Sequence, residues 1–231
     1  MIETLQSLEL TPFILSFKLA AITTIILLFV SLPLAWYLSQ TKSKTKPLIE
    51  AVTSLPIVLP PSVLGFYILW AMSQNSPIGA FYEETFGVQL AFSFTGLVIA
   101  SCFYSLPFMV QPLQSGFESL NKNMLEASYI SGKSKITTIF RVALPNMKPA
   151  VITALIITFA HTVGEFGVVL MVGGSIPGET KVASVAIYEM VEIMDYDSAH
   201  IYSMILLLLS FIVLLFVYIF NYKYRSKIGI R

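Results

Sequence analysis

Five long apolar stretches dominate this sequence of 231 residues and constrain its fold more than any other feature. A helix needs about 20 mostly apolar residues to cross the hydrocarbon core of a membrane, and each stretch is long enough. Only 12% of the residues are charged, about half the share found in a soluble domain. We therefore expect an all-α, polytopic integral membrane protein. The five expected spans cover residues 12–38, 51–72, 92–113, 149–172 and 201–222.

The composition also argues against several other classes of protein. A soluble enzyme or a disordered chain would need more charge, and a formal net charge of +1 offers little attraction for nucleic acid. The single cysteine, Cys102, cannot form an internal disulfide, and no Cys/His cluster has zinc spacing. We expect Cys102 to be a small buried residue and the chain to bind no metal or cofactor of its own. No repeat or flexible linker divides the chain, so one membrane domain is expected.

Basic residues occupy three segments that fall on one side of the expected spans. These segments hold 12 of the 14 Lys and Arg residues: Lys42, Lys44, Lys46, Lys122, Lys133, Lys135, Arg141, Lys148, Lys223, Arg225, Lys227 and Arg231. Loops rich in Lys and Arg stay in the cytoplasm. We therefore expect a multi-pass protein of the bacterial inner membrane, with its N-terminus outside and its C-terminus in the cytoplasm.

Acidic residues predominate on the opposite, outer side. They are Glu3, Glu9, Glu83, Glu84, Glu179, Glu189, Glu192, Asp195 and Asp197. Lys18 lies early in the first span, and its long side chain is expected to reach the outer interface. The outer segment 173–200 is too polar to span, but its apolar residues recur near helical spacing. It predicts a short helix that lies on the outer face.

The cytoplasmic segment 118–146 is also too polar to span, yet it has a helical pattern. Asn123 is expected to cap a first short helix over residues 124–130, which makes Glu126 the third residue of that helix. Gly132 is expected to end it, because glycine readily takes the positive φ angle of a tight turn. The segment therefore begins as a helix followed by a glycine turn.

A second helical run is expected over residues 135–143, ending before Pro145. The two helices would form a hairpin whose apolar faces contain Leu125, Tyr129, Ile136, Ile139 and Phe140. So much apolar surface on a cytoplasmic loop indicates a docking partner. An amphipathic hairpin at the membrane interface, without a partner, is the alternative.

Six residues of this segment fall in the register of a known motif. They are Glu126, Ala127, Gly132, Phe140, Leu144 and Pro145. In this register the segment resembles the EAA loop of bacterial ABC-importer permeases, with Ser128 in place of the second alanine. The resemblance implies a type I ABC importer permease fold. It also implies that the first helix of the loop is a coupling helix, which docks in a groove on a separate ATPase subunit.

The same loop contains an incomplete nucleotide-binding pattern. The run Gly132-Lys133-Ser134 matches the end of a Walker A motif, but Ala127 stands where that motif requires glycine. No strand precedes the run, and the chain has no room for a nucleotide-binding domain. We therefore expect a transport subunit rather than an enzyme, with ATP and Mg bound by a partner ATPase.

Two ionisable residues distinguish the fourth span. His161 and Glu165 are four positions apart and would share one face of a continuous helix. Such residues usually face a bundle interior or water. They could form a metal pair or a proton relay, although the other spans offer few further partners. In a third interpretation, Gly164 and Gly167 let backbones approach at a subunit interface beside a pathway, which Phe166 could plug.

The second span contains several prolines. Pro60 and Pro61 each lack a backbone donor and disfavour helix in the residue before them. The carbonyl groups that they leave free must face protein or water rather than lipid. This pattern indicates a kinked helix that lines a pathway, and a simple bend at the start of a helix is the alternative. Pro107 and Pro112 in the third span indicate the same with less force.

Two patches give a more specific resemblance. Residues 55–69 read LPIVLPPSVLGFYIL, and residues 164–181 read GEFGVVLMVGGSIPGETK, followed by IYEMVE. Both patches resemble the permeases of molybdate importers, and the likeness extends over residues 15–210. Sulfate permeases share the GEFG-like core but usually differ in the loop after it. The resemblance implies the membrane permease subunit of an ATP-driven molybdate importer, with tungstate, sulfate and thiosulfate as alternative substrates.

The expected assembly follows from the number of helices. Five helices are too few to enclose a pathway for a hydrated tetrahedral anion, whereas a symmetric homodimer supplies ten. The resemblance implies two cytoplasmic ATPase subunits below the dimer and a periplasmic molybdate-binding protein above it. No Arg or Lys cluster lines the spans, so selectivity is expected in the binding protein. The rival class is a secondary transporter driven by an ion gradient, which would depend on His161, Glu165 and Lys18.

Overall fold

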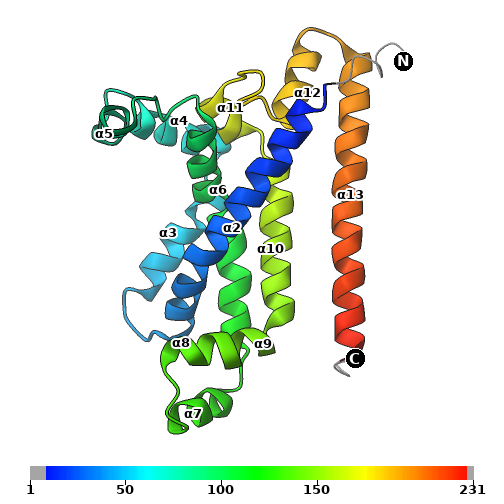
Figure 1. Cartoon of the computed structure of the whole chain (residues 1–231). Coiled ribbons are helices and arrows are strands. Elements are labelled where there is room, and N and C mark those ends of the chain that lie inside the picture. The colour runs from blue at the N-terminus through cyan, green and yellow to red at the C-terminus, as the bar shows by residue number, and fades with distance from the viewer. Residues whose placement is uncertain (1–8, 228–231) are drawn as a thin grey trace.

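Three helices of the computed structural model are long and apolar enough to cross a membrane. They are α2 (Thr11–Gln40), α6 (Phe94–Glu118) and α13 (Tyr196–Lys227), which match the first, third and fifth expected spans. The structure describes residues 9–227, so Glu3 and Arg231, which helped to predict the orientation, lie outside the described residues. Within residues 9–227 every regular element is a helix, which confirms the all-α class (Figure 1).

The second expected span is broken into two helices. α3 (Lys46–Val58) and α4 (Pro61–Met72) meet at an angle of 110°. The break falls at Leu59 and Pro60, which both have an extended ψ of 137°. Pro60 and Pro61 cannot donate backbone hydrogen bonds to a continuing helix, so the chain turns there. The predicted kink is confirmed, and α3 and α4 are long enough to cross a membrane only as a pair.

The fourth expected span is interrupted as well. α10 (Lys148–Val163) and α11 (Gly167–Gly173) are separated by three residues. Phe166 leaves helical geometry, with φ −127° and ψ −55°. The Glu165 carboxylate then starts the new helix by accepting a hydrogen bond from the Val168 N–H at 3.2 Å. The expectation of one continuous helix is therefore wrong.

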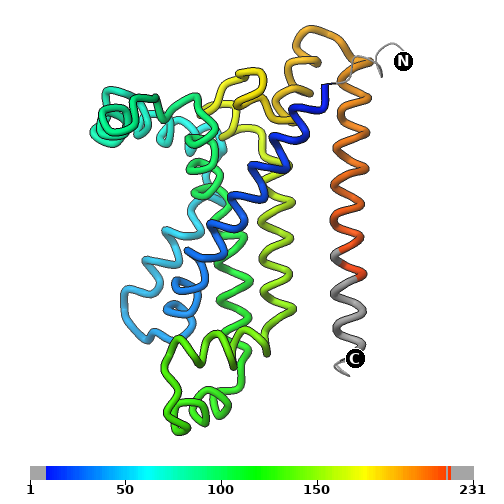
Figure 2. The backbone as a smooth tube through the Cα atoms, in the orientation of Figure 1, coloured from blue at the N-terminus to red at the C-terminus, as the bar shows by residue number. Residues whose placement is uncertain are grey.

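α2, α6 and α10 pack against one another and form the centre of the molecule (Figure 1, Figure 2). The main buried cluster between them includes Leu27, Met109, Leu113, Phe117 and Ala154. Gly116 permits close packing of α6 on α10, because a Cβ atom at this position would lie 2.6 Å from the Cβ of Ala150. α13 stands apart from this centre, and only 11% of its spanning segment is buried. Its apolar surface is therefore left for lipid or another subunit.

Two short helices lie at the end of the molecule that carries the N-terminus of α2. α5 (Pro77–Phe86) was not expected; it is capped by Ser76, whose Oγ accepts the Gly79 N–H. α12 (Ala183–Glu192) is the helix expected in the outer segment, but it does not lie free on a surface. Its start is buried against α2, where Ser16 Oγ accepts the Ala183 N–H at 2.9 Å.

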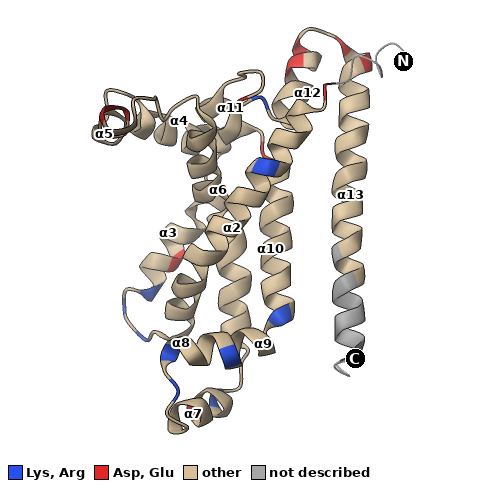
Figure 3. Cartoon of the chain, viewed as in Figure 1, with Lys and Arg blue, Asp and Glu red and all other residues tan. Residues whose placement is uncertain are grey.

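Charges separate along the long axis of the molecule. Figure 3 shows Lys and Arg gathered around α7, α8 and α9, and Asp and Glu concentrated at the opposite end around α5 and α12. The N-terminus of α2 lies at the acidic end and the C-terminus of α13 at the basic end. Lys18 lies in the first third of α2, with its Nζ 4.6 Å from the centre of the Phe94 ring. The charge asymmetry of the sequence thus becomes an asymmetry between the two ends of the fold.

Candidate functional site

The first candidate region is the hairpin at the basic end. α7 (Lys122–Ile130) begins after Asn121, whose Oδ1 accepts the Asn123 N–H at 2.9 Å. Asn121, not Asn123, is therefore the cap, and the predicted start was two residues too late. Asparagine is a favourable cap at either position, and in the structure Lys122 and Asn123 already belong to the helix. Glu126 is consequently the fifth residue of α7 and not the third.

The turn after α7 has the geometry that the sequence predicted. Gly132 has φ +74°, a value that glycine accepts at little cost. Its N–H donates to the Tyr129 carbonyl at 2.9 Å, and the Lys133 N–H donates to the Ser128 carbonyl at 3.2 Å. These two bonds make a Schellman motif, which satisfies carbonyl groups at the end of the helix.

The second arm of the hairpin runs further than expected. α8 (Lys135–Thr138), the π-helical turn η1 (Ile139–Ala143) and α9 (Leu144–Asn146) follow one another without a gap. The expectation that the helix ends before Pro145 is wrong. In the wide turn of η1, the Leu144 N–H donates to the Ile139 carbonyl, five residues back. This wider turn accommodates the ring of Pro145, which would collide with the preceding turn of a regular α-helix.

A buried hydrogen bond joins the two arms. Ser128 Oγ and Thr138 Oγ1 lie 2.9 Å apart, and both side chains are buried. Ser128 is the residue that departs from the EAA pattern, so the hydroxyl in place of a methyl group gives this hairpin an additional internal tie. An unpaired buried hydroxyl would cost about 1–3 kcal/mol, which makes the pairing of the two residues favourable.

The hairpin divides its apolar residues between two sides. Leu125 and Ala143 are buried in the central cluster, whereas Ile130, Ile136 and Phe140 are 87%, 70% and 60% exposed. The remaining motif residues are Glu126, Ala127, Leu144 and Pro145, of which only Leu144 is partly buried. Exposed apolar surfaces of this kind are typical of sites where another protein docks.

The second candidate region lies where the two helix breaks meet. α4 and α11, the second halves of the broken spans, cross in close contact. A Cβ atom on Gly167 would lie 2.7 Å from Pro61 Cβ, and one on Gly65 would lie 2.9 Å from Met171 Cβ. These two glycines let the backbones approach. Gly164 has no such role among the described residues, because the nearest atom to an added Cβ is the Ala160 carbonyl oxygen, 3.6 Å away in the last turn of α10.

Glu165 is held inside this crossing and not on an open face. Its side chain is 4% exposed, and its Oε1 accepts the Val168 N–H. Its backbone carbonyl accepts a 2.6 Å hydrogen bond from Ser184 Oγ of α12, while Oε2 has no partner among the described residues. The carboxylate therefore caps α11. The expectation that His161 and Glu165 share one helix face is wrong, because α10 ends at Val163 between them.

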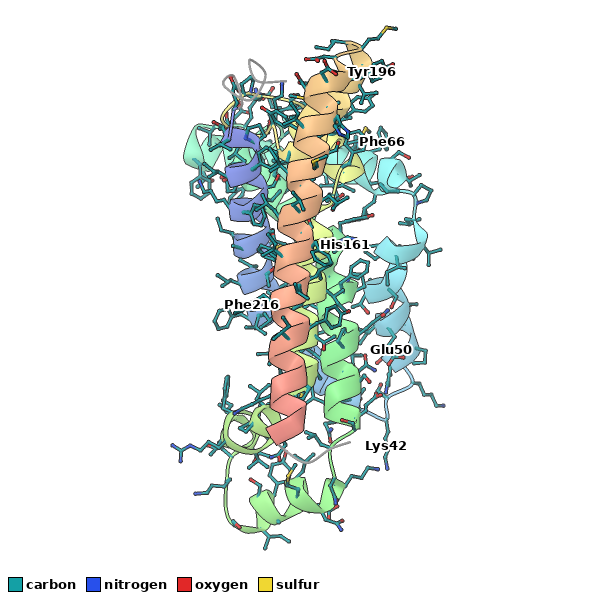
Figure 4. The ribbon with its side chains drawn as sticks, turned by 90° about the vertical axis from the view of Figure 1, so that its right-hand side faces the viewer. Lys42, Glu50, Phe66, His161, Tyr196 and Phe216 are labelled. Carbon is teal, nitrogen blue, oxygen red and sulfur yellow. The ribbon has the colours of Figure 1, made fainter. Side chains whose placement is uncertain are left out.

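His161 belongs to an aromatic cluster on the packed pair α6 and α10. Its ring stacks on Phe108 with a centroid distance of 3.8 Å and lies 4.7 Å from the ring of Tyr104. Its Nδ1 is 3.2 Å from Ser105 Oγ. Figure 4 shows His161 about midway along the molecule, well above Glu50 and Lys42. Phe166, which could plug the route in the third interpretation, packs on the Tyr188 ring with a centroid distance of 4.9 Å.

A set of polar side chains continues from this cluster toward the basic end. Gln111 donates to Ser54 Oγ at 3.1 Å, and Gln114 donates to Glu50 Oε1 at 2.7 Å. A cavity of about 400 Å³ follows between the end of α6 and the beginning of α10. Its polar lining residues are Ser115, Ser119, Asn146 and Thr153. Sequence reasoning missed this set, although two glutamines beside Pro112 in an otherwise apolar span were a usable signal.

Known proteins resemble this chain over nearly its full length. The family described as "Binding-protein-dependent transport system inner membrane component" matches residues 20–226. The "Molybdenum transport system permease protein ModB" of Azotobacter vinelandii is 47% identical over 210 residues, which cover 91% of this chain and 93% of that protein. The "Probable sulfate transport system permease protein cysT" of Zygnema circumcarinatum is 34% identical over 222 residues, covering 96% of this chain and 76% of the relative.

Solved structures show the same fold at low sequence identity. A chain of the MetNI methionine ABC transporter, in an inward-facing conformation, matches with a TM-score of 0.75 at 15% identity, covering 96% of this chain and 99% of that one. A chain of a bacterial ABC transporter that imports alginate matches with a TM-score of 0.70 at 16% identity, covering 92% and 79%. The fold is that of ABC importer permeases. Together with the sequence match, it shows that this multi-pass membrane chain belongs to the family of binding-protein-dependent transport system inner membrane components.

Proposed function

We propose that this chain is the permease subunit of an ATP-driven importer of molybdate. The observation that carries the proposal is its 47% identity to a molybdenum transport permease, over nearly the full length of both proteins. The identity to a sulfate transport permease is 34%. Sulfate is also a tetrahedral oxyanion, so it is the second candidate substrate, and tungstate is the third.

The hairpin of α7, α8, η1 and α9 is the site at which a separate ATPase docks. Glu126 and Ala127 are exposed on α7, and Phe140 is exposed on the second arm, where a groove of a partner can receive them. Gly132 fixes the angle between the arms, and Leu144 and Pro145 join the hairpin to α10. ATP and Mg are bound by the partner. This chain supplies the hairpin that transmits the movement of the ATPase, and it does not supply the ATPase site.

Two copies of the chain form the pathway in our proposal, with their α6–α10 faces toward a common axis. The hydroxyl and amide groups between Gln111 and Thr153 offer neutral donors, which let an oxyanion pass without trapping it. Pro60, Pro61 and Gly167, at the crossing of the broken helices, form the point about which the pathway opens and closes. His161, with its aromatic neighbours, lines the route, whereas Glu165 and Phe166 support the crossing from within.

The proposed orientation places the acidic end and the N-terminus outside the cell and the basic end in the cytoplasm of a bacterial inner membrane. This orientation brings the hairpin to the ATP-containing side, as coupling requires, and follows from the excess of Lys and Arg at that end. A periplasmic binding protein then docks on the outer end and delivers the selected oxyanion. Selectivity resides in that protein, because the described residues of α6 and α10 include no cluster of Lys and Arg along the route.

Uptake by the reconstituted complex tests this proposal. The permease, its ATPase and its binding protein are placed in proteoliposomes, and uptake of labelled molybdate, tungstate and sulfate is measured with and without enclosed ATP. We expect ATP-dependent uptake in which molybdate competes better than sulfate. A stronger competition by sulfate would favour the second candidate. Uptake that does not depend on ATP and is abolished by a protonophore would refute an ATP-driven importer.

A further inference from the structure

A cavity at the basic end lies beside the base of the hairpin and apart from the proposed pathway. It has a volume of about 450 Å³ and is enclosed by the end of α2, the end of α6 and the beginning of α7. Its polar lining consists of Ser39, Gln40, Thr41, Lys42, Glu118 and Lys122. The cavity is large enough for a phosphate-containing group, and hydroxyl, amide and ammonium donors surround it.

The charge balance of this cavity favours an anion. Lys42 and Lys122 come from separate segments, and neither forms an ion pair with a described residue. The single acid, Glu118, already accepts bonds from Lys46 Nζ at 3.2 Å and from Gln114 Nε2 at 3.1 Å. The charge of that carboxylate is thus offset locally, and two ammonium groups remain in excess.

The surface beside the cavity indicates the kind of anion. Along α2, Phe29, Val30 and Tyr37 are 71%, 52% and 46% exposed, and the same side of the helix leads to Gln40 at the cavity. The rise of an α-helix places Phe29 about 16 Å from Gln40. One leaflet of the hydrocarbon core is about 15 Å thick. An acyl chain can therefore lie on this stripe while its headgroup reaches the cavity, which a free phosphate ion would not require.

We propose that this cavity binds the headgroup of an anionic phospholipid such as phosphatidylglycerol, whose acyl chains lie along α2. Its phosphate accepts hydrogen bonds from the ammonium groups of Lys42 and Lys122. Basic pockets between spanning helices are suited to such headgroups. The bound lipid joins the end of α2 to the start of α7, which otherwise contacts the central cluster through Leu125 and the second arm of the hairpin through the Ser128–Thr138 bond. The hairpin and α2 then move as one unit.

Lipid binding to the purified full chain tests this site without any need for transport. The chain is exchanged between nanodiscs of phosphatidylcholine and nanodiscs that contain 25% phosphatidylglycerol, and retained lipid is measured by native mass spectrometry. We expect the wild type to retain phosphatidylglycerol selectively. Each lysine that contacts the bound headgroup should contribute about a fivefold preference for anionic lipid, equivalent to about 1 kcal/mol. The double variant Lys42→Gln with Lys122→Gln should therefore lose about 25-fold in preference.

A matched control carries Lys44→Gln with Lys133→Gln, which removes the same charge from exposed lysines of the same end that do not line the cavity. The control should retain phosphatidylglycerol like the wild type. Equal loss in both variants, or equal retention of phosphatidylcholine by the wild type, would overturn the site. Displacement of the lipid by millimolar inorganic phosphate would also overturn it, in favour of a soluble anion. Because the binding measurement involves neither ATP nor molybdate, it is independent of the proposed transport function.

Discussion

Alanine substitutions at Gly167 and Gly164 test whether the close approach of α4 and α11 stabilises the fold. Only Gly167 lies at that contact. In Gly167→Ala the new Cβ would lie 2.7 Å from Pro61 Cβ, whereas carbon atoms are comfortable at about 3.5–4.0 Å. The α4–α11 crossing must therefore open by about 1 Å. Overpacking of this kind costs about 1–3 kcal/mol. Alanine recovers up to about 1 kcal/mol of helix propensity, so the net loss should be about 1–2 kcal/mol.

Gly164→Ala is the matched control for this prediction. Its added Cβ would meet no atom closer than 3.6 Å, and its φ of −84° suits alanine. The control should be as stable as the wild type. Thermal unfolding of the solubilised chain measures both variants, and a loss of 1 kcal/mol corresponds to about 2–4 °C for a chain of this size. ATP-dependent uptake should fall only in the Gly167 variant.

A double-mutant cycle with Pro61→Gly identifies the atom responsible. Pro61→Gly removes the Cβ that the new methyl group meets, so adding Gly167→Ala in that background should cost much less than it costs alone. If Gly167→Ala is as stable and as active as Gly164→Ala, the close approach of the two helix breaks does not determine the packing, and the proposed pivot is wrong.

Three further predictions test the hairpin, the orientation and the buried carboxylate. Gly132→Val forces a β-branched residue to φ +74°, so ATPase activity should become uncoupled from uptake while membrane insertion persists; normal uptake would contradict the docking role. Single cysteines at Lys44 and Glu83, in a Cys102→Ser background, should label from opposite sides of the membrane, and external labelling at Lys44 would reverse the orientation. Glu165→Gln retains an oxygen that can cap α11, so uptake into ATP-loaded vesicles should survive and resist a protonophore. Loss of that uptake, together with protonophore sensitivity in the wild type, would restore the ion-gradient class.

Apolar content predicted where the spans lie but not where they break. The break at Pro60 and Pro61 was visible, because proline removes a backbone donor whatever surrounds it. The break after Val163 was not, because glycine occurs in many spanning helices. The break also depends on the hydrogen bond that Ser184 of α12 donates to the Glu165 carbonyl, which forms only when α12 packs against the break. Local chemistry was thus sufficient at one break and tertiary geometry decided the other.

The hairpin also contains features that local sequence predicts and features that it does not. The turn at Gly132 followed from the freedom of glycine alone, and it has the expected positive φ. The cap and the end of the second arm were misplaced, because Asn121 and Asn123 are equivalent as sequence and because a π-turn lets the helix continue through Pro145. The polar set near Gln111 was missed for a related reason. Its importance depends on α3 and α6 lying together, which the order of residues does not reveal.

The polar groups at the α10–α11 break form hydrogen bonds within the protein, and these bonds limit what Glu165 and His161 can do. Backbone groups freed within a membrane must find partners in the protein. Here the Glu165 carboxylate accepts the Val168 N–H, and Ser184 donates to the Glu165 carbonyl. Glu165 therefore has a structural role at the break. His161 lies on the other side of the break, stacked on Phe108. A proton relay needs the acid and the imidazole to face one another, whereas this fold directs them to different neighbours. This geometry is consistent with the proposed function, in which the energy for transport enters through the exposed hairpin at the basic end.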